Sequence, residues 1–431
     1  MPVLGSDPWE FRGASVEPTG VLGRLVDAAG GEWDLGLVRS PAVLAGVLVA
    51  FAAALTPLVR RWRLDAAVAL TLAVLALLTV PAVLLQVGLR QGSEPWFFTN
   101  DSTYQIELAG DLVLDGDNPY GHDYTGSGQE RFYPAVGEPR EQVALRHFAY
   151  FPGTPELAAA WRLLPAPLDD FRVLVLLATL GTFFAALLFR VPLGVRLAAG
   201  AVLAGNPLAV RAAWFGTADA PSLLLLVLAF ALVTRSRYGW AAASLAAAVL
   251  SKQFALVAVP FLAVMVLQRA PRPAAVRAGA VFAAVLAVGA LPFVIADPGA
   301  LWRDTVAYGA DTYRIVGYGL SAALLELGVL EDRRGPYPFL PLVLLVWLPV
   351  TALLLRSQAR VASSPWLGGV GFTASMFLLL YLGRVFQVSY LAWPLTGLVL
   401  TVLLAQLSSN ATGADERLRF PARSSTTRVS R

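Results

Sequence analysis

Long runs of apolar residues limit the possible folds of this chain more than any other feature of its sequence. A helix needs about 20 mostly apolar residues to cross the ~30 Å hydrocarbon core of a bilayer. With 57% hydrophobic and only 14% charged residues, the chain differs from ordinary soluble enzymes. We therefore expect an all-α integral membrane protein with about 11 transmembrane helices. The 11 runs are 41–59, 66–89, 171–189, 197–214, 220–234, 239–251, 253–268, 278–296, 338–355, 362–383 and 386–406.

The arginines indicate how these runs cross the membrane. They fall in alternate connections, which the positive-inside rule assigns to the cytoplasm. The run 239–268 is short for two helices and long for one, and the polar triplet 251–253 interrupts it. The alternation fails if 239–268 is a single span, so we favour two. The N-terminus is then outside and the C-terminus cytoplasmic. The arginine-bearing connections are 60–63, 190–196, 235–237, 269–277 and 356–360.

This topology divides the chain into an extracytoplasmic segment 1–40, a polytopic transmembrane domain 41–406 and a cytoplasmic tail 407–431. The Ser/Thr/Arg composition of the tail predicts disorder. Two long connections, 91–170 and 297–337, fall on the outer face. The first carries 13 acidic residues and the second six, so any polar site belongs there. The arginines are scattered among apolar runs, which gives no basis for nucleic-acid binding.

Local signals predict two short interfacial helices in the first outer connection. Ser102 and Gln105 have the spacing of a capping box, and Gly116 ends the run that follows. A second helix is expected to begin with Thr154 as its N-cap and Pro155 in its first turn. Such helices hold polar groups at headgroup level. The expected apolar stripe of the first helix is Tyr104, Leu108 and Leu112.

Acidic and histidine side chains in this connection are candidates for chemistry. Asp101 follows the span 66–89 closely and can act as a base or as the N-cap of the next helix. Asp117 and Asp123 flank a Pro-Tyr-Gly-His turn, where they can hold sugar hydroxyls or serve as Asx-turn residues. The two histidines, His122 and His147, have no metal-ligand spacing, and we expect no metal.

Cations at membrane depth are the other informative residues, because each is expensive to bury and tends to face a cavity or a partner. Lys252, the single lysine, can bind a phosphate or extend to the outer headgroups. Arg384, between the last two spans, is a second candidate phosphate ligand. Arg211 and Asp219 lie at one helix end and can pair with each other.

The order of these features resembles the polytopic GT-C glycosyltransferases, most of all the polyprenyl-phosphate-mannose-dependent mannosyltransferases of glycosyltransferase family 87. The resemblance covers about 66–406. The sequence departs from the family in the additional span 41–59 and a long insertion at 125–146, which leaves the acceptor in doubt. The similar motifs are Asp101 after a span, Gly116-Asp-Asn-Pro-Tyr120, Phe148-Ala-Tyr-Phe-Pro152, Gly205-Asn-Pro207, Gly216-Thr-Ala-Asp219 and Ser251-Lys252.

The resemblance implies an inverting transfer of a sugar, mannose or another hexose or pentose, from a polyprenyl-phosphate carrier to a cell-envelope glycolipid or glycan. The enzyme would act at the outer face of a bacterial-type plasma membrane, among membrane lipids, and need no cofactor. Asp101 matches the general base, and Lys252 and Arg384 would bind the donor phosphate. The other expected substrate-binding residues are Tyr104, Asp117, Tyr120, His122, Asp123, His147, Asp219 and Gln253.

Two other classes of function remain open at this point. A secondary transporter or flippase also suits Pro- and Gly-interrupted spans with a buried lysine, although the sequence has no matching halves. A non-catalytic lipid-binding scaffold would need neither the acid nor the cation. Asp101 and Lys252 on one outer cavity would favour the transferase, whereas a pocket at midplane would favour the transporter.

Overall fold

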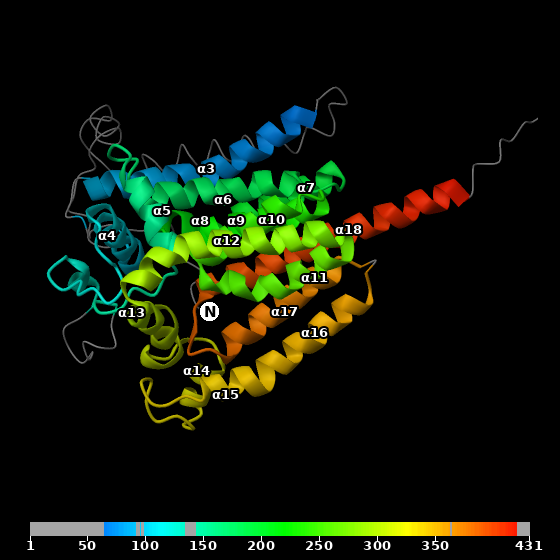
Figure 1. The fold of residues 1–431 in the computed structure, drawn as a ribbon. Coiled ribbons are helices and arrows are strands. Elements are labelled where there is room, and N and C mark those ends of the chain that lie inside the picture. Colours follow the sequence, from blue (N-terminus) through cyan, green and yellow to red (C-terminus); the bar gives the residue numbers. More distant parts are fainter. Residues whose placement is uncertain (1–63, 92–94, 96–98, 134–143, 363, 420–431) are drawn as a thin grey trace, which may run out of the picture.

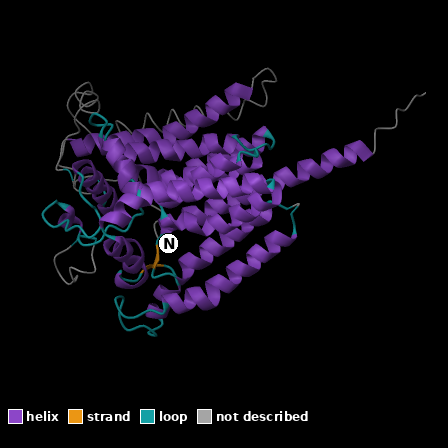
Figure 2. Cartoon of the chain, viewed as in Figure 1, coloured by secondary structure: helices purple, strands orange, loops and turns teal. Residues whose placement is uncertain are grey.

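The computed structural model describes residues 64–91, 95, 99–133, 144–362 and 364–419. The predicted segment 1–40 and the predicted span 41–59 lie outside these residues. The regular secondary structure of the described residues is helical apart from a parallel pair of two-residue strands, β1 (Val316–Gly317) and β2 (Val385–Phe386), drawn in orange in Figure 2. The all-α expectation is therefore confirmed.

Most helices lie side by side in a bundle, and the shorter elements gather at one end of it (Figure 1). Each predicted apolar run within the described residues forms helix. The bundle helices are α3 (Leu64–Gln91), α6 (Phe171–Leu187), α7 (Leu193–Gly205), α8 (Pro207–Phe215), α9 (Asp219–Thr234), α10 (Tyr238–Ser251), α11 (Val259–Arg269), α12 (Arg272–Ala296), α15 (Phe339–Leu342), α16 (Leu348–Arg360), α17 (Trp366–Leu382) and α18 (Ala392–Arg419).

Four helical segments of the described chain are long and apolar enough to cross a bilayer: Ala67–Gly88, Arg272–Ala296, Phe339–Arg360 and Val388–Leu407. The bent pair Leu193–Gly205 and Pro207–Ala213 makes a fifth if it is one span. The remaining apolar helices have 10–17 residues. These segments are those of a multi-pass membrane protein.

Two predicted runs break in ways that sequence periodicity did not determine. The run 197–214 bends by 51° between α7 and α8, because Pro207 begins α8 and Asn206 Oδ1 accepts from Leu208 N and Ala209 N. The uncertain run 239–268 forms two helices. Between them Lys252 is extended, with φ −157° and ψ 124°, and a 3₁₀ turn, η4 (Gln253–Ala258), leads into α11.

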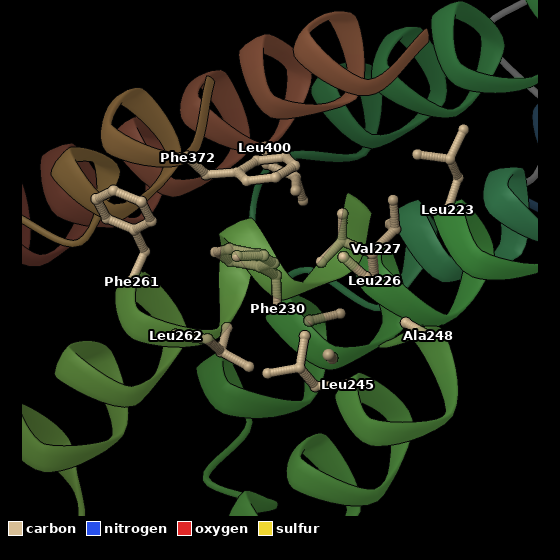
Figure 3. Close-up of a cluster of buried hydrophobic side chains, with 14 of the residues drawn as sticks. Leu223, Leu226, Val227, Phe230, Leu245, Ala248, Phe261, Leu262, Phe372 and Leu400 are labelled. Carbon is tan, nitrogen blue, oxygen red and sulfur yellow. The ribbon is translucent and has the colours of Figure 1, made fainter. Parts of the chain in front are cut away.

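The core lies between α9, α10, α11, α17 and α18 (Figure 3). Phe230 of α9, Phe261 of α11 and Phe372 of α17 are fully buried in it. Other helices keep apolar side chains on the outside, such as Val288 on α12 and Leu345 in η6 (Val343–Trp347), the π-helical segment before α16, which are 76% and 77% exposed. A core on one side and exposed apolar side chains on the other are what a bilayer-embedded bundle requires.

The two predicted short helices exist as α4 (Asp101–Asp115) and α5 (Gly153–Arg162), but both bury polar as well as apolar residues. They pack closely on each other, since a Cβ on Gly110 would meet the Ala158 backbone at 2.8 Å. The buried face of α4 includes polar residues, Thr103 and Glu107 among them, whereas Leu108 and Leu112 are half-buried. The predicted stripe of Tyr104, Leu108 and Leu112 does pack inward, since Tyr104 is buried and both leucines pack against a buried apolar cluster, but other segments also enclose polar residues of α4.

Shorter elements complete the same end of the bundle. The second long connection contains α13 (Pro298–Trp302), a π-helical segment η5 (Arg303–Thr312) and α14 (Leu320–Glu326). At the opposite end, α18 continues to Arg419. The part of the predicted disordered tail from 407 to 419 is therefore helical.

Candidate functional site

Asp101 begins α4, and the chain before it fixes its position. Asn100, not Ser102 or Asp101, is the N-cap: its Oδ1 accepts from Thr103 N at 2.9 Å and from Ser102 Oγ at 2.6 Å. The predicted capping box is therefore wrong, as is a capping role for Asp101. Asn100 Nδ2 also donates to the Phe215 carbonyl, so α4 is anchored to the end of α8.

A second contact joins α4 to the turn between α8 and α9. Thr103 Oγ1 donates to the Gly216 carbonyl at 2.7 Å. Gly216 has φ +83°, and a Cβ there would lie 2.3 Å from Thr103 Oγ1 and 2.6 Å from Arg172 Cγ. Only glycine fits both the left-handed backbone and the close approach. The Gly216-Thr-Ala-Asp219 motif thus supports the helix that carries Asp101.

The carboxylate of Asp101 is half-buried and lies against a tyrosine from the long insertion. Its Oδ1 accepts from Ser102 N at 2.8 Å, and Oδ2 accepts from the Tyr133 hydroxyl at 3.2 Å. Gln129 Nε2 donates to the Asp101 carbonyl at 3.2 Å. Burial raises the pKa of Tyr133, and the Asp101 charge raises it further, so Tyr133 stays a neutral hydrogen-bond donor.

Lys252 occupies a cage of aromatic rings where α10 ends. Its side chain is 9% exposed, which excludes extension to the headgroups. Nζ lies 4.6 Å from the ring centroid of Tyr150, 5.6 Å from that of Phe254 and 6.0 Å from that of Tyr390. Such contacts stabilise a desolvated cation.

Asp219, at the first position of α9, is the ion-pair partner of Lys252 at 3.8 Å. Trp393 Nε1 donates to the same carboxylate oxygen at 2.9 Å. The expected Arg211–Asp219 pair was therefore wrong: the bend at Asn206 redirects α8, and Arg211 lies over the ring of Phe215 instead.

Tyr150 links the two charged groups that the sequence singled out. Burial raises its pKa, a hydrogen bond with Ser102 lowers it, and the Asp101 and Asp219 charges raise it. Its ring meanwhile lies against the Lys252 ammonium. One buried tyrosine therefore connects Lys252 to Ser102, the residue next to Asp101, although 151 positions separate Asp101 and Lys252 in the chain. In the sequence, Tyr150 entered only as part of the Phe148-Ala-Tyr-Phe-Pro152 motif.

A buried aspartate that the sequence did not single out connects the two long connections. Asp304, 2% exposed, accepts from Gly121 N at 2.8 Å and Phe148 N at 3.3 Å. Its other oxygen lies 2.9 Å from His147 Nδ1, and the His147 ring stacks on Tyr308. His147 therefore has a carboxylate partner within the fold, and the two connections meet at the same end of the bundle.

Other predicted binding residues have contacts within the protein. The Tyr104 hydroxyl donates to the Ser127 carbonyl at 2.6 Å, and that of Tyr120 donates to the Tyr150 carbonyl at 2.8 Å. Gln253 Nε2 donates to the Ala149 carbonyl at 3.2 Å. These contacts support the segment that carries Tyr150.

The surface turn 117–123 is less enclosed. Asp117 is exposed, and His122 packs its ring edge-to-face on Tyr124. Asp123 forms an Asx turn with Thr125 N and pairs with Arg146. Hydrogen bonds from the side chain and the backbone N–H of Thr125 lower the pKa of Asp123, burial opposes this, and Arg146 lowers it further. Of the two predicted roles for Asp123, the structure therefore shows the Asx turn.

Arg384 has a structural environment. Its side chain is 1% exposed, and its guanidinium donates to the carbonyls of Tyr313 at 2.8 Å and Gly335 at 3.1 Å. It immediately precedes β2, which pairs with β1. These contacts tie the second long connection to the link between α17 and α18. A role in binding phosphate stays a prediction.

One measured cavity, of about 400 Å³, lies between α3, α4 and the segment after α5. Neither Asp101 nor Lys252 lines it. It does not lie at the middle of the bundle either. The cavity is therefore neither the shared Asp101–Lys252 cavity expected of a transferase nor the midplane pocket expected of a transporter.

The site contains two groups of opposite charge. The Asp101 carboxylate accepts a hydrogen bond from the neutral Tyr133. The Lys252 ammonium lies against the ring of Tyr150 and makes no hydrogen bond to the described part of the chain. A carboxylate can accept a proton, and an ammonium can stabilise a negative charge in a poorly hydrated setting. Comparison with protein-family models, with curated proteins and with solved structures found no match to this chain.

Proposed function

We propose that the protein is an inverting glycosyltransferase that moves a sugar from a polyprenyl-phosphate carrier to a cell-envelope glycolipid or glycan. The sugar expected from the sequence resemblance is mannose. The reaction would take place at the outer face of the membrane, with 11 spans, the N-terminus outside and the C-terminus in the cytoplasm. The observation that carries the proposal is that Tyr150 faces the Lys252 ammonium with its ring and hydrogen-bonds with Ser102, the residue next to Asp101.

In this reaction Asp101 is the general base. An acceptor hydroxyl attacks the anomeric carbon of the donor sugar, a new C–O bond forms, and the hydroxyl proton passes to the Asp101 carboxylate. Tyr133 and the Ser102 amide hold the two carboxylate oxygens in place. One carboxylate suffices, because the departing lipid phosphate leaves as an anion and needs no proton, unlike the leaving group of a glycoside hydrolase.

Lys252 stabilises that phosphate. As the anomeric C–O bond breaks, its electron pair goes to the phosphate oxygen, and a cation in a poorly hydrated site lowers the energy of the developing charge. Asp219 lies 3.8 Å from Lys252 Nζ, beyond the 2.7–3.2 Å typical of a hydrogen bond. The three ammonium donors can therefore turn to a phosphate while Asp219 keeps the lysine in place.

Transfer can be tested with membranes from cells that express the protein. They are incubated with radiolabelled polyprenyl-phosphate-mannose, and the lipid and glycan fractions are examined for label. A new labelled product that is missing with Asp101→Asn supports the proposal. Full-length protein that binds the donor but forms no labelled product with any envelope fraction contradicts it. Donor movement across vesicles without transfer would instead identify a flippase.

A further inference from the structure

The cavity beside α4 has a lining unlike that of the Asp101–Lys252 region. Its volume of about 400 Å³ lies within the ~300–1,000 Å³ typical of small-molecule sites. The walls come from the end of α3, one face of α4 and the end of α5 with the segment that follows. Two arginines and four carboxylates line it: Arg90, Arg162, Glu107, Asp111, Asp169 and Asp170.

Both arginines of the cavity are held by its carboxylates. Arg90 Nη1 and Nη2 donate to the two oxygens of Glu107 at 3.0 and 2.6 Å, and Nη1 also donates to Asp170 at 3.0 Å. Arg162 donates to Asp111 through Nε at 2.9 Å and to Asp169 through Nη1 at 2.6 Å. Arg172, outside the lining, also pairs with Asp170, so four carboxylates face three guanidinium groups and the lining disfavours an anionic ligand such as phosphate.

The two buried carboxylates differ in how they keep their charge. Burial raises the pKa of Asp170, but Arg172 and Arg90 outweigh burial and hold it below its usual range. Burial raises the pKa of Glu107, and Arg90 only partly offsets that rise. Asp170 is thus the firm anion of the pair, and the bidentate Arg90 contact fixes Glu107 in orientation.

Carboxylate oxygens have lone pairs beyond those used by an arginine, so they can accept hydrogen bonds from ligand hydroxyls. Between the charged groups the walls are apolar, formed by Val87, Leu108, Pro167 and the ring of Tyr104. Among the described residues no group of three acidic or histidine side chains has an arrangement suited to a metal ion. A ligand that combines many hydroxyls with apolar C–H faces, such as a pyranose, fits this combination.

We propose that this cavity binds a short neutral saccharide. Tyr104 and Asp111, which line it, lie on the same face of α4 as Asp101, because they follow it by three and ten residues. Tyr104 is only about 4.5 Å along the helix axis from Asp101, at 1.5 Å per residue. The saccharide site stands without any transfer reaction. Its use to hold the acceptor glycan rests on the proposed function.

Calorimetric titration of the full-length protein in nanodiscs with neutral mannose di- and trisaccharides tests the site. Asp111→Asn removes a partly exposed acceptor, and Ala166→Arg places a long cation at the cavity. Each is expected to raise the Kd at least about tenfold, which corresponds to about 1.4 kcal/mol. The matched controls Asp115→Asn on α4 and Ala160→Arg on α5 are exposed, lie outside the cavity lining and should leave the Kd unchanged.

Three results would overturn the proposal. The first is no saccharide binding by the wild-type protein at millimolar concentration. The second is equal binding by Ala166→Arg, which would put the saccharide elsewhere. The third is stronger binding of inorganic phosphate or tetramethylammonium than of saccharide, which would identify an anion or cation site. Because binding is measured directly, these results are independent of whether labelled mannose is transferred.

Discussion

The ammonium nitrogen of Lys252 lies 3.8 Å from Asp219 Oδ1, the oxygen that also accepts from Trp393 Nε1 at 2.9 Å. The three residues come from the end of α10, the start of α9 and the start of α18. The ion pair is buried but longer than a hydrogen bond, so Asp219 holds the lysine in place without using its N–H donors. Because the ion pair and the free donors involve different partners, substitutions at Lys252 and Asp219 can distinguish an effect on stability from an effect on catalysis.

Replacement of Lys252 alone should lower both stability and activity. Lys252→Met leaves Asp219 as a buried, unpaired carboxylate, which destabilises the fold by up to ~3–5 kcal/mol. The double variant Lys252→Met/Asp219→Asn keeps an acceptor for Trp393 and should restore the Tm. It should not restore donor binding or turnover. Thermal melts and donor KM measurements distinguish the two effects. If the double variant turns over at the wild-type rate, Lys252 has no role in the reaction.

Asp101→Asn should reduce turnover without reducing stability. General base catalysis contributes ~10²- to 10⁴-fold, so kcat should fall by that order. The Tm should change little, because Asn100 and not Asp101 caps α4. Asn100→Ala, by contrast, should lower stability by about 0.5–2 kcal/mol. Turnover of Asp101→Asn close to the wild-type rate would rule out the assigned base.

Gly216→Ala should destabilise the protein more than Gly116→Ala. Both glycines have left-handed backbone, with φ +83° and +85°, so each substitution strains the backbone by ~1–2 kcal/mol. At Gly216 the new Cβ also meets Thr103 and Arg172, whereas at Gly116 nothing lies within 4 Å. Overpacking adds ~1–3 kcal/mol. Thermal melts of both variants measure the difference, and equal Tm losses would mean that α4 does not dock on this turn as described.

Glu156 should make stability fall as pH rises toward neutrality. Burial raises the pKa of Glu156 from its ordinary value of 4.5 to about 7 in the folded protein. Below the unfolded pKa both states are protonated, and the stabilising effect of the neutral carboxyl is present in full. It is lost as pH rises through about 7, because the folded state then releases a proton that it held more tightly.

Melting curves of wild type and Glu156→Gln between pH 4.5 and 8 measure this dependence. The Tm difference between the two proteins should shift in favour of Glu156→Gln as pH rises. Glu326→Gln on α14, an exposed glutamate, serves as the matched control and should give a constant difference. A Tm difference for Glu156→Gln that is independent of pH would show that Glu156 has an ordinary aqueous environment.

The helices and their order followed largely from local sequence, but their bends and caps did not. Apolar runs predicted α3, α6, α9, α12 and α17 with small errors at the ends. The bend at Asn206-Pro207 and the extended Lys252 depend on single hydrogen bonds and backbone angles. The N-cap of α4 moved from Ser102 to Asn100 because Asn100 has a partner at Phe215, 115 residues along the chain.

The sequence by itself determined that the chain forms apolar helices and that its acids concentrate in two connections, because hydrophobicity and charge are properties of each residue. It also drew attention to Asp101 and Lys252. Only the tertiary structure decided their partners. Tyr150 and Asp304 were not singled out, and Asp219 was expected to pair with Arg211, because burial and ion pairing depend on which distant segments meet. Helix packing decides which distant segments come together, and the pattern of apolar and charged residues along the chain does not predict that packing.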